Sequence, residues 1–141
     1  MSIDVLINIK SQLNYETITH TAEGKLYLKD NEFYLRYNEH QDLGKTTSIV
    51  KWNEQIPLKI TIIRQGDVKV KHVFQKDLTD YATYQSIQGM LEISTTTLDL
   101  SFKKESLTNG IIKIKYLLVI NKQTIGKNSI TILYKEIRDV K

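Results

Sequence analysis

The chain contains no cysteine, one proline and only two alanines among its 141 residues. The absence of cysteine excludes a disulfide scaffold, a thiolate zinc site and a cysteine nucleophile, and it fits a reducing cytoplasm. Helix is disfavoured over nearly the whole length, because alanine, the best helix former, is so rare.

Long hydrophobic runs are also lacking. Asp4 and Asn8 interrupt the apolar start of the chain, so no signal peptide is predicted. The longest apolar run with an aromatic residue, at 116–120, is far shorter than the roughly 20 residues that cross a bilayer. We therefore expect a cytoplasmic protein with no membrane partner.

The known enzyme and metal motifs are absent as well. The sequence has no G-x-S-x-G, G-x-G-x-x-G or H-E-x-x-H pattern and no EF-hand loop. His20, His40 and His72 lack metal-ligand spacing, and we expect them at the surface or the rim. We predict no catalytic residue, no metal site and no cofactor, and the protein is not expected to be an enzyme.

What the chain does have is the composition of an ordinary globular domain, with 40% hydrophobic and 26% charged residues. Isoleucine, valine, threonine and the aromatic residues make up 52 of the 141 residues, which favours β-structure. No linker, repeat or low-complexity segment divides the sequence, so residues 1–141 are interpreted as one domain.

Alternation of apolar and polar residues with a period of two predicts the strands. They are expected at Ile3–Leu13, Thr17–Lys29, Glu32–Glu39, Lys45–Trp52, Pro57–Gln65, Val68–Gln75, Ala82–Lys104, Ile111–Lys122 and Asn128–Glu136. Tight turns are expected at Asp30-Asn31, Gly66-Asp67 and Asn109-Gly110, where residues tolerate positive φ. Gly89, inside the long segment 82–104, predicts a bulge or sharp bend rather than a turn. Gly24 predicts a similar feature in the strand expected at 17–29. Residues 76–80 are expected to form one helical turn.

A series of short hairpins must protect its edges, and closure into a barrel removes them. We predict an all-β fold, a single antiparallel up-and-down β-barrel of about eight to ten strands, with a β-sandwich as the alternative. An unpaired edge at either end of the meander would favour a homodimer.

Charge is unevenly distributed along the chain. Residues 1–102 carry a net −2 and residues 103–141 a net +6. Lys113 and Lys115 alternate with isoleucines, as on the solvent face of a half-buried strand, and we favour that interpretation over a nucleic-acid site. A nucleic-acid partner is therefore considered unlikely, and no RNA-binding motif supports one.

One polar patch stands out inside the predicted barrel. The inward faces of two strands end in charges of opposite sign, Glu39 and Arg64, and in a meander these ends meet at one mouth. Tyr37 is on the same face as Glu39, and Tyr84 is expected nearby. The patch has two interpretations: an ion pair that plugs the barrel, or a guanidinium that binds the anionic group of a ligand.

Several short motifs resemble those of the YwiB-like family of small bacterial proteins of unknown function. The resemblance rests on Tyr34-Leu35-Arg36-Tyr37-Asn38-Glu39, Asp42-Leu43-Gly44-Lys45, Arg64-Gln65-Gly66, the spacing from Tyr84 to Gly89 before Leu91-Glu92-Ile93-Ser94-Thr95, Gly110-Ile111-Ile112 with Tyr116, and Asn128 with Ile130-Thr131-Ile132. It spans nearly the whole chain. It implies a calycin-type barrel, the lipocalin-like shape shared with fatty-acid-binding proteins, in the cytoplasm of Gram-positive bacteria, and it implies no function.

Two functional hypotheses follow. The first is a non-enzymatic binder of a small amphipathic or anionic ligand inside the barrel, with Tyr37, Glu39, Arg64 and Tyr84 as ligand-binding residues. The alternative is an interaction module that binds a protein or nucleic-acid partner through its basic C-terminal strands.

Overall fold

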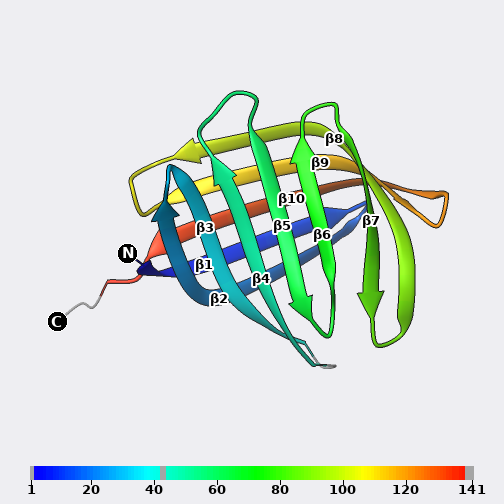
Figure 1. Ribbon diagram of the computed structural model, residues 1–141, viewed down its shortest axis with the longest axis horizontal. Helices are drawn as coiled ribbons and strands as arrows, with labels where there is room; N and C mark the ends of the chain where they lie inside the picture. The colour runs from blue at the N-terminus through cyan, green and yellow to red at the C-terminus, as the bar shows by residue number, and fades with distance from the viewer. Residues whose placement is uncertain (1, 42–43, 139–141) are drawn as a thin grey trace.

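The computed structural model describes residues 2–41 and 44–138, which form one antiparallel sheet of ten strands. The strands are β1 (Ser2–Leu13), β2 (Glu16–Lys29), β3 (Glu32–Gln41), β4 (Gly44–Asn53), β5 (Lys59–Gly66), β6 (Val70–Gln75), β7 (Thr79–Ser86), β8 (Gly89–Lys104), β9 (Gly110–Ile120) and β10 (Gln123–Glu136). The sheet curls so that β4–β7 cross in front of β1 and β8–β10 (Figure 1). The prediction of an all-β, up-and-down barrel is confirmed, and the barrel is nearly closed.

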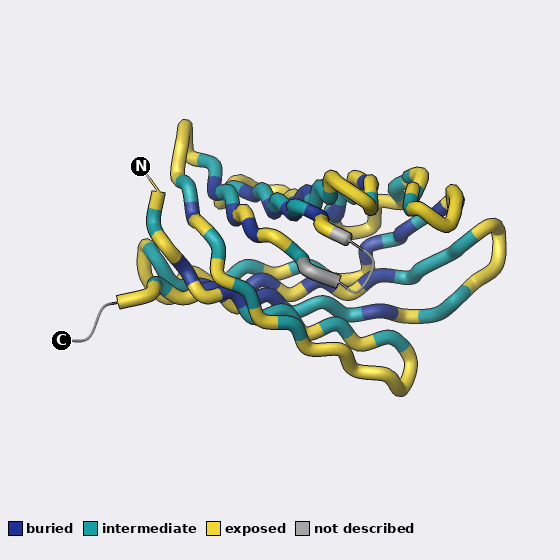
Figure 2. Tube along the Cα trace, turned by 90° about the horizontal axis from the view of Figure 1, so that it is seen from below, coloured by how far each residue is buried: buried dark blue, intermediate teal, exposed yellow. Residues whose placement is uncertain are grey.

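Alternation places the apolar side chains between the two layers. In β9, Ile112 and Ile114 are fully buried while Lys113 and Lys115 are exposed, as their spacing predicts. The buried segments face one another across the interior, and the hairpin ends are exposed (Figure 2).

The barrel is interrupted between β6 and β7, which are the two edges of the sheet. The ends of the meander are not edges, because β1 pairs with β10 from Val5–Glu136 to Leu13–Asn128. The β6 and β7 edges face each other, and one bridge joins them through backbone bonds of 2.8 and 2.9 Å between Lys69 and Gln85. We call this junction the seam.

One end of the barrel interior is filled by aromatic side chains. Phe33 stacks on Trp52 with ring centroids 5.2 Å apart, and Phe102 meets Trp52 edge-on at 5.3 Å. Trp52 is 2% exposed. Side chains fill this end of the barrel, so a ligand site is expected at the opposite end.

Two glycines behave differently from the prediction. Gly89 begins β8 directly after the tight turn at residues 87–88, with a φ of +126°, so it ends a hairpin and is not a bulge. The bulge in β8 lies between Thr97 and Asp99 instead. Gly24 keeps regular pairing on both sides, and a Cβ there would approach the Arg36 carbonyl oxygen to 2.4 Å, so close packing requires the glycine.

Some connections also differ from the prediction. The turn after β6 contains Asp77 at a φ of 67° and leads directly into β7, so residues 76–80 form no helical turn. Asn121 and Lys122, at φ 47° and 67°, make a tight turn inside the strand expected at 111–122. Asn109-Gly110 closes a longer loop from 105, whereas Asp30-Asn31 is a two-residue turn as predicted. Asp42 and Leu43 lie outside the described residues.

Candidate functional site

Glu39 and Arg64 meet inside the barrel, as their spacing on β3 and β5 predicts. The Arg64 Nη2 and Nε atoms donate hydrogen bonds of 2.7 and 3.1 Å to Glu39 Oε2. The two side chains are 21% and 13% exposed, so the pair is mostly screened from water. Both donors reach one carboxylate oxygen, which leaves Glu39 Oε1 and the Nη1 group of Arg64 outside these two bonds.

Tyr37 lies beside this pair. It is 6% exposed and pairs in register with Ser48 of β4, which in turn faces Arg64 of β5. Burial, together with the negative charge of Glu39, raises the pKa of Tyr37 to about 12. Tyr37 is therefore a neutral hydrogen-bonding group at physiological pH.

Tyr84 lies on β7 and lines a pocket at the polar mouth of the barrel, about 390 Å³ in volume. Thr46 of β4 is on the opposite wall, and it pairs in register with Glu39. Among the described residues no hydrogen bond joins Tyr84 to Tyr37, Glu39 or Arg64. The sequence predicts that Tyr84 lies near these residues at one mouth of the barrel. In the structure Tyr84 lines the pocket at that mouth and makes no hydrogen bond with the ion pair.

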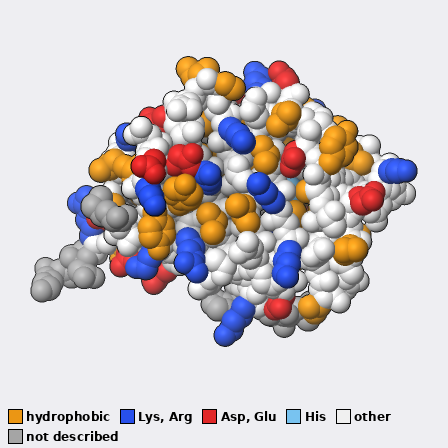
Figure 3. Space-filling model, in the orientation of Figure 1, with side chains coloured by type: hydrophobic (Ala, Val, Ile, Leu, Met, Phe, Trp, Pro, Cys, Tyr) orange, Lys and Arg blue, Asp and Glu red, His pale blue; other side chains and the backbone are white. Residues whose placement is uncertain are grey.

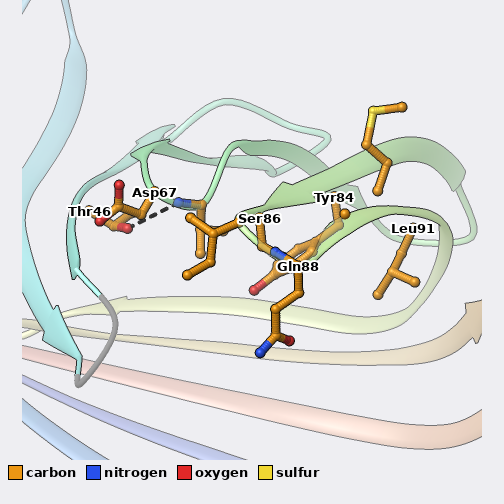
Figure 4. Close-up of a pocket in the computed structure, with 10 residues that line it drawn as sticks. Thr46, Asp67, Tyr84, Ser86, Gln88 and Leu91 are labelled. Atoms are coloured by element: carbon orange, nitrogen blue, oxygen red, sulfur yellow. Dashed lines mark hydrogen bonds between the residues drawn. The ribbon is translucent and has the colours of Figure 1, made fainter.

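The pocket lies between β4, the β5–β6 turn and the β7–β8 hairpin (Figure 4). Thr46 and Asp67 form one side, and the β7–β8 hairpin forms the other with Ser86, Gln88 and Leu91. The Val68 N–H donates to Thr46 Oγ1 at 3.3 Å, and the Lys45 N–H donates to Asp67 Oδ2 at 2.8 Å. These bonds fix the β5–β6 turn against β4. Ile87 and Met90 make the hairpin side largely apolar.

A second group of polar residues, which the sequence reasoning missed, faces inward from the other layer. Thr97 of β8, Tyr116 of β9 and Asn128 of β10 pair in register as one row across the sheet. The Asn128 amide donates to the Tyr116 hydroxyl at 2.5 Å. Thr95 lies two residues before Thr97 on the same face, and both threonines are buried. The polar spacing of Thr95 and Thr97 inside a long strand was the available signal.

Several of these buried atoms have no hydrogen-bond partner among the described residues. They are Thr95 Oγ1, Thr97 Oγ1, Asn128 Oδ1 and His72 Nδ1. Buried polar groups are nearly always paired, and each unpaired one costs about 1–3 kcal/mol. Trp52 Nε1 and the Tyr134 hydroxyl, at the aromatic end, are unpaired as well, so the unpaired polar atoms are spread along the interior and are not confined to the mouth.

His72 lies on the inner face of β6, so the expectation of a surface or rim histidine is wrong for it. Its ring centroid is 5.7 Å from that of Phe74, and the Phe74 ring is 5.2 Å from the Tyr116 ring of the other layer. Burial lowers the pKa of His72, opposed in part by the negative charge of Asp80. The Nε2 of His20 is buried as well, and the side chain of His40 is outside the described part.

The described residues contain no group of three histidine, cysteine, aspartate or glutamate side chains placed to hold a metal ion. They also include no helix with the length and hydropathy of a membrane span.

Comparison with known proteins gives the family. A model of a domain of unknown function, DUF1934, matches residues 3–132. The chain belongs to the DUF1934 family. An uncharacterized β-barrel protein of Bacillus subtilis (strain 168), YwiB, is 30% identical over 135 residues, which cover 93% of this chain and 92% of the relative. The predicted resemblance to the YwiB-like family is therefore confirmed.

A solved structure supports the fold. The crystal structure of the Bacillus subtilis YwiB protein superposes with a TM-score of 0.82 at 28% identity, covering 97% of this chain and 94% of that one. That relative is named as an uncharacterized β-barrel protein. The family assignment thus agrees with the barrel architecture and implies no function.

Proposed function

We propose that this DUF1934 protein is a non-enzymatic binder of a small amphipathic ligand at the polar mouth of the barrel. The observation that carries the proposal is a pocket of about 390 Å³, lined by both apolar and polar residues, at the end of the barrel where the mostly buried Glu39–Arg64 pair lies. Ligand sites are mostly apolar pockets with a few converging polar groups, and the mouth combines both.

The arrangement sets the orientation of the ligand. The aromatic end around Trp52 is packed, so it offers no room for the apolar part of a ligand. The apolar surface available to a ligand is instead on the β7–β8 hairpin, at Ile87 and Met90, which are 66% and 68% exposed. The polar group of the ligand would then point inward, and its apolar part would lie against the hairpin.

Arg64 limits the charge of that polar group. Two of its nitrogens are already engaged by Glu39, so an anion must either use the remaining Nη1 group or displace the carboxylate. Asp67, which also lines the pocket, disfavours a second negative charge. An uncharged or singly charged polar group therefore fits best.

A fluorescent amphipathic anion, 1-anilinonaphthalene-8-sulfonate, tests the mouth directly. We expect one saturable site whose affinity falls when Ile87 and Met90 are both replaced by glutamine. The matched control is Ile56→Gln, since Ile56 is 98% exposed on the β4–β5 connection, away from the pocket residues. Equal affinity in the two variants would refute the proposal.

The role of Arg64 in binding is tested in a variant that has no unpaired buried charge. The double variant Glu39→Gln with Arg64→Met removes both charges, and dye binding should be lost while the fold is retained. Native mass spectrometry of the freshly purified protein, compared with its denatured mass, then looks for a small adduct carried from the cell. An adduct lost in the double variant gives the class of the natural ligand.

The alternative is the interaction module on the basic C-terminal strands. Lys113 and Lys115 are exposed on the outer face of β9, with Asp99 of β8 opposite Lys115. An acidic neighbour weakens this face as a phosphate-binding surface. Binding of single-stranded RNA whose affinity falls steeply with added salt would favour the module, because phosphate contacts release counterions. No binding at low salt is the result we expect. Homodimerisation and a cytoplasmic location stay predictions.

A further inference from the structure

The first half of β2 is a strand edge without a partner. β1 pairs with β2 as far as the closing pair Leu13–Glu16, whereas β3 pairs with β2 only from Lys29 to Gly24. Beyond that point β3 continues along β4, and β2 runs alone along the lower border of the back layer (Figure 1). In the described part of the chain no strand lies against this side of residues 16–22, which we call the β2 edge.

The free backbone groups of the β2 edge belong to three threonines. Leu13 and Glu16 close a two-residue turn, and the residues of such a closing pair hydrogen-bond to each other. Glu16 and every second residue after it therefore direct their N–H and C=O groups to β1, and Thr17, Thr19 and Thr21 direct theirs away from it. The β2–β3 hairpin gives the same alternation. Among the described residues no backbone hydrogen bond reaches the three threonines from the free side.

The β2 edge lacks the usual protection of a free strand. Lysine, proline and β-bulges commonly prevent such a strand from pairing with another chain. Residues 16–22 contain no lysine and no proline, and their register with β1 is regular. Ile18 is 65% exposed, and the three threonines are exposed as well. The edges of β6 and β7, by contrast, face each other and are bridged at the seam.

The threonines of the β2 edge are complementary to themselves in the antiparallel direction. A twofold axis through Thr19 places Thr17 of one copy opposite Thr21 of the other, and Thr19 opposite its own equivalent. Each of these opposite pairs would exchange two backbone hydrogen bonds. Cross-strand pairs of threonine also stabilise a sheet through their side chains.

The side chains on the inner face fit the same register. Ile18 would lie opposite His20 of the second copy, which covers an apolar side chain that is otherwise exposed. Glu16 would lie opposite Ala22, so no like charges meet across the pair of strands.

The front wall of the barrel is less suited to a second copy. Arg36, Lys59 and Lys71 are exposed on the outer faces of β3, β5 and β6. Figure 3 shows Lys and Arg side chains spread over this side of the molecule. Two copies that met there would bring like charges together, which is unfavourable.

We propose that the β2 edge binds a second copy of this chain by antiparallel strand pairing about Thr19, which joins two barrels through one continuous sheet. The β2 edge shares no residue with the pocket at the mouth, so the interface does not depend on a ligand there. Strand pairing alone buries less area than a standard interface, and the dimer should therefore be weak, with a dissociation constant of about 10–100 µM.

Sedimentation velocity of the full chain at about 10 to about 300 µM tests the dimer, and the wild type should change from monomer to dimer over this range. Thr19→Pro removes an N–H group of the edge and leaves the groups that bond to β1. Thr19→Lys leaves the backbone intact and places two lysines opposite each other at the axis, so it stays informative if the proline variant unfolds. Each variant should weaken dimerisation at least about tenfold.

The matched controls are Thr83→Pro and Thr83→Lys. Thr83 is exposed on the β7 edge, and its N–H group also points away from the paired strand, as that of Gln85 does. Both control variants should dimerise like the wild type.

Amide hydrogen exchange locates the interface. The amides of Thr17, Thr19 and Thr21 should exchange more slowly at high than at low protein concentration, whereas those of Ile18 and His20, which bond to β1, should not change. A monomer at about 300 µM would overturn the proposal and leave the edge to a foreign extended segment. A dimer without protection of the three threonines, or equal losses in the edge variants and their controls, would place the contact elsewhere and overturn it too.

Discussion

Removing Arg64 should destabilise the fold by leaving the Glu39 carboxylate without its cation. A fully buried charge that loses its partner costs about 3–5 kcal/mol, whereas an exposed pair contributes about 0–1 kcal/mol. The side chains of Arg64 and Glu39 are 21% and 13% exposed, so the pair is nearer the buried limit. We expect Arg64→Met to lower the free energy of unfolding by about 2–3 kcal/mol.

Urea unfolding followed by fluorescence measures this loss, because the single tryptophan, Trp52, is buried in the aromatic end and reports global unfolding. In a thermal scan the same loss lowers the melting temperature by about 6–10 °C for a domain of this size. Adding Glu39→Gln to Arg64→Met should restore most of the stability, since neither partner is then left as an unpaired charge.

An exposed ion pair of equal length is the matched control. Lys25 Nζ lies 2.7 Å from Asp4 Oδ1, the same separation as in the Glu39–Arg64 pair, but these side chains are 52% and 67% exposed. Lys25→Met should unfold at nearly the wild-type urea concentration. If Arg64→Met lost no more stability than Lys25→Met, or if the double variant did not recover, the reasoning from burial would be refuted.

Three further predictions concern the interior. Burial lowers the pKa of His72 in the folded state, so the stability that the neutral side chain contributes is present above the unfolded pKa of about 6.5. That stability is lost as the pH falls toward the pKa of the folded state. His72→Gln should therefore reduce the loss of stability between about pH 7 and 5.5, measured as the shift of the urea midpoint. An unchanged pH dependence would contradict this assignment. Tyr134→Phe should leave stability unchanged or raise it by up to about 1 kcal/mol, because its buried hydroxyl has no partner among the described residues. Tyr116→Phe, which removes the acceptor of the Asn128 bond, should instead cost about 1 kcal/mol in the same urea assay; equal effects of the two would argue against the difference in hydrogen bonding. Gly24→Ala should cost about 1–3 kcal/mol in thermal unfolding, since a Cβ there would lie 2.4 Å from the Arg36 carbonyl oxygen, and a wild-type melting temperature would show that the backbone yields.

The fold and part of the site were predictable because the side-chain alternation of a strand is a local property. Parity assigned Ile112 and Ile114 to the inside and Lys113 and Lys115 to the outside, and it brought Glu39 and Arg64 to one mouth. The same rule applied to β8 would have placed Thr95 and Thr97 inside. It could not show that Thr97 forms a row with Asn128, because that depends on the register between three strands.

The sequence by itself determined the all-β class, the order of the hairpins, the inward faces and the convergence of the ion pair, all through the period of two and the charges at strand ends. Only the tertiary structure decided where the barrel is interrupted. The pairing of β1 with β10 joins residues more than a hundred positions apart, and it moves the edges from the chain ends to β6 and β7. Closure, the filling of the aromatic end and the row of Thr97, Tyr116 and Asn128 arise from such distant pairings, which no local pattern encodes.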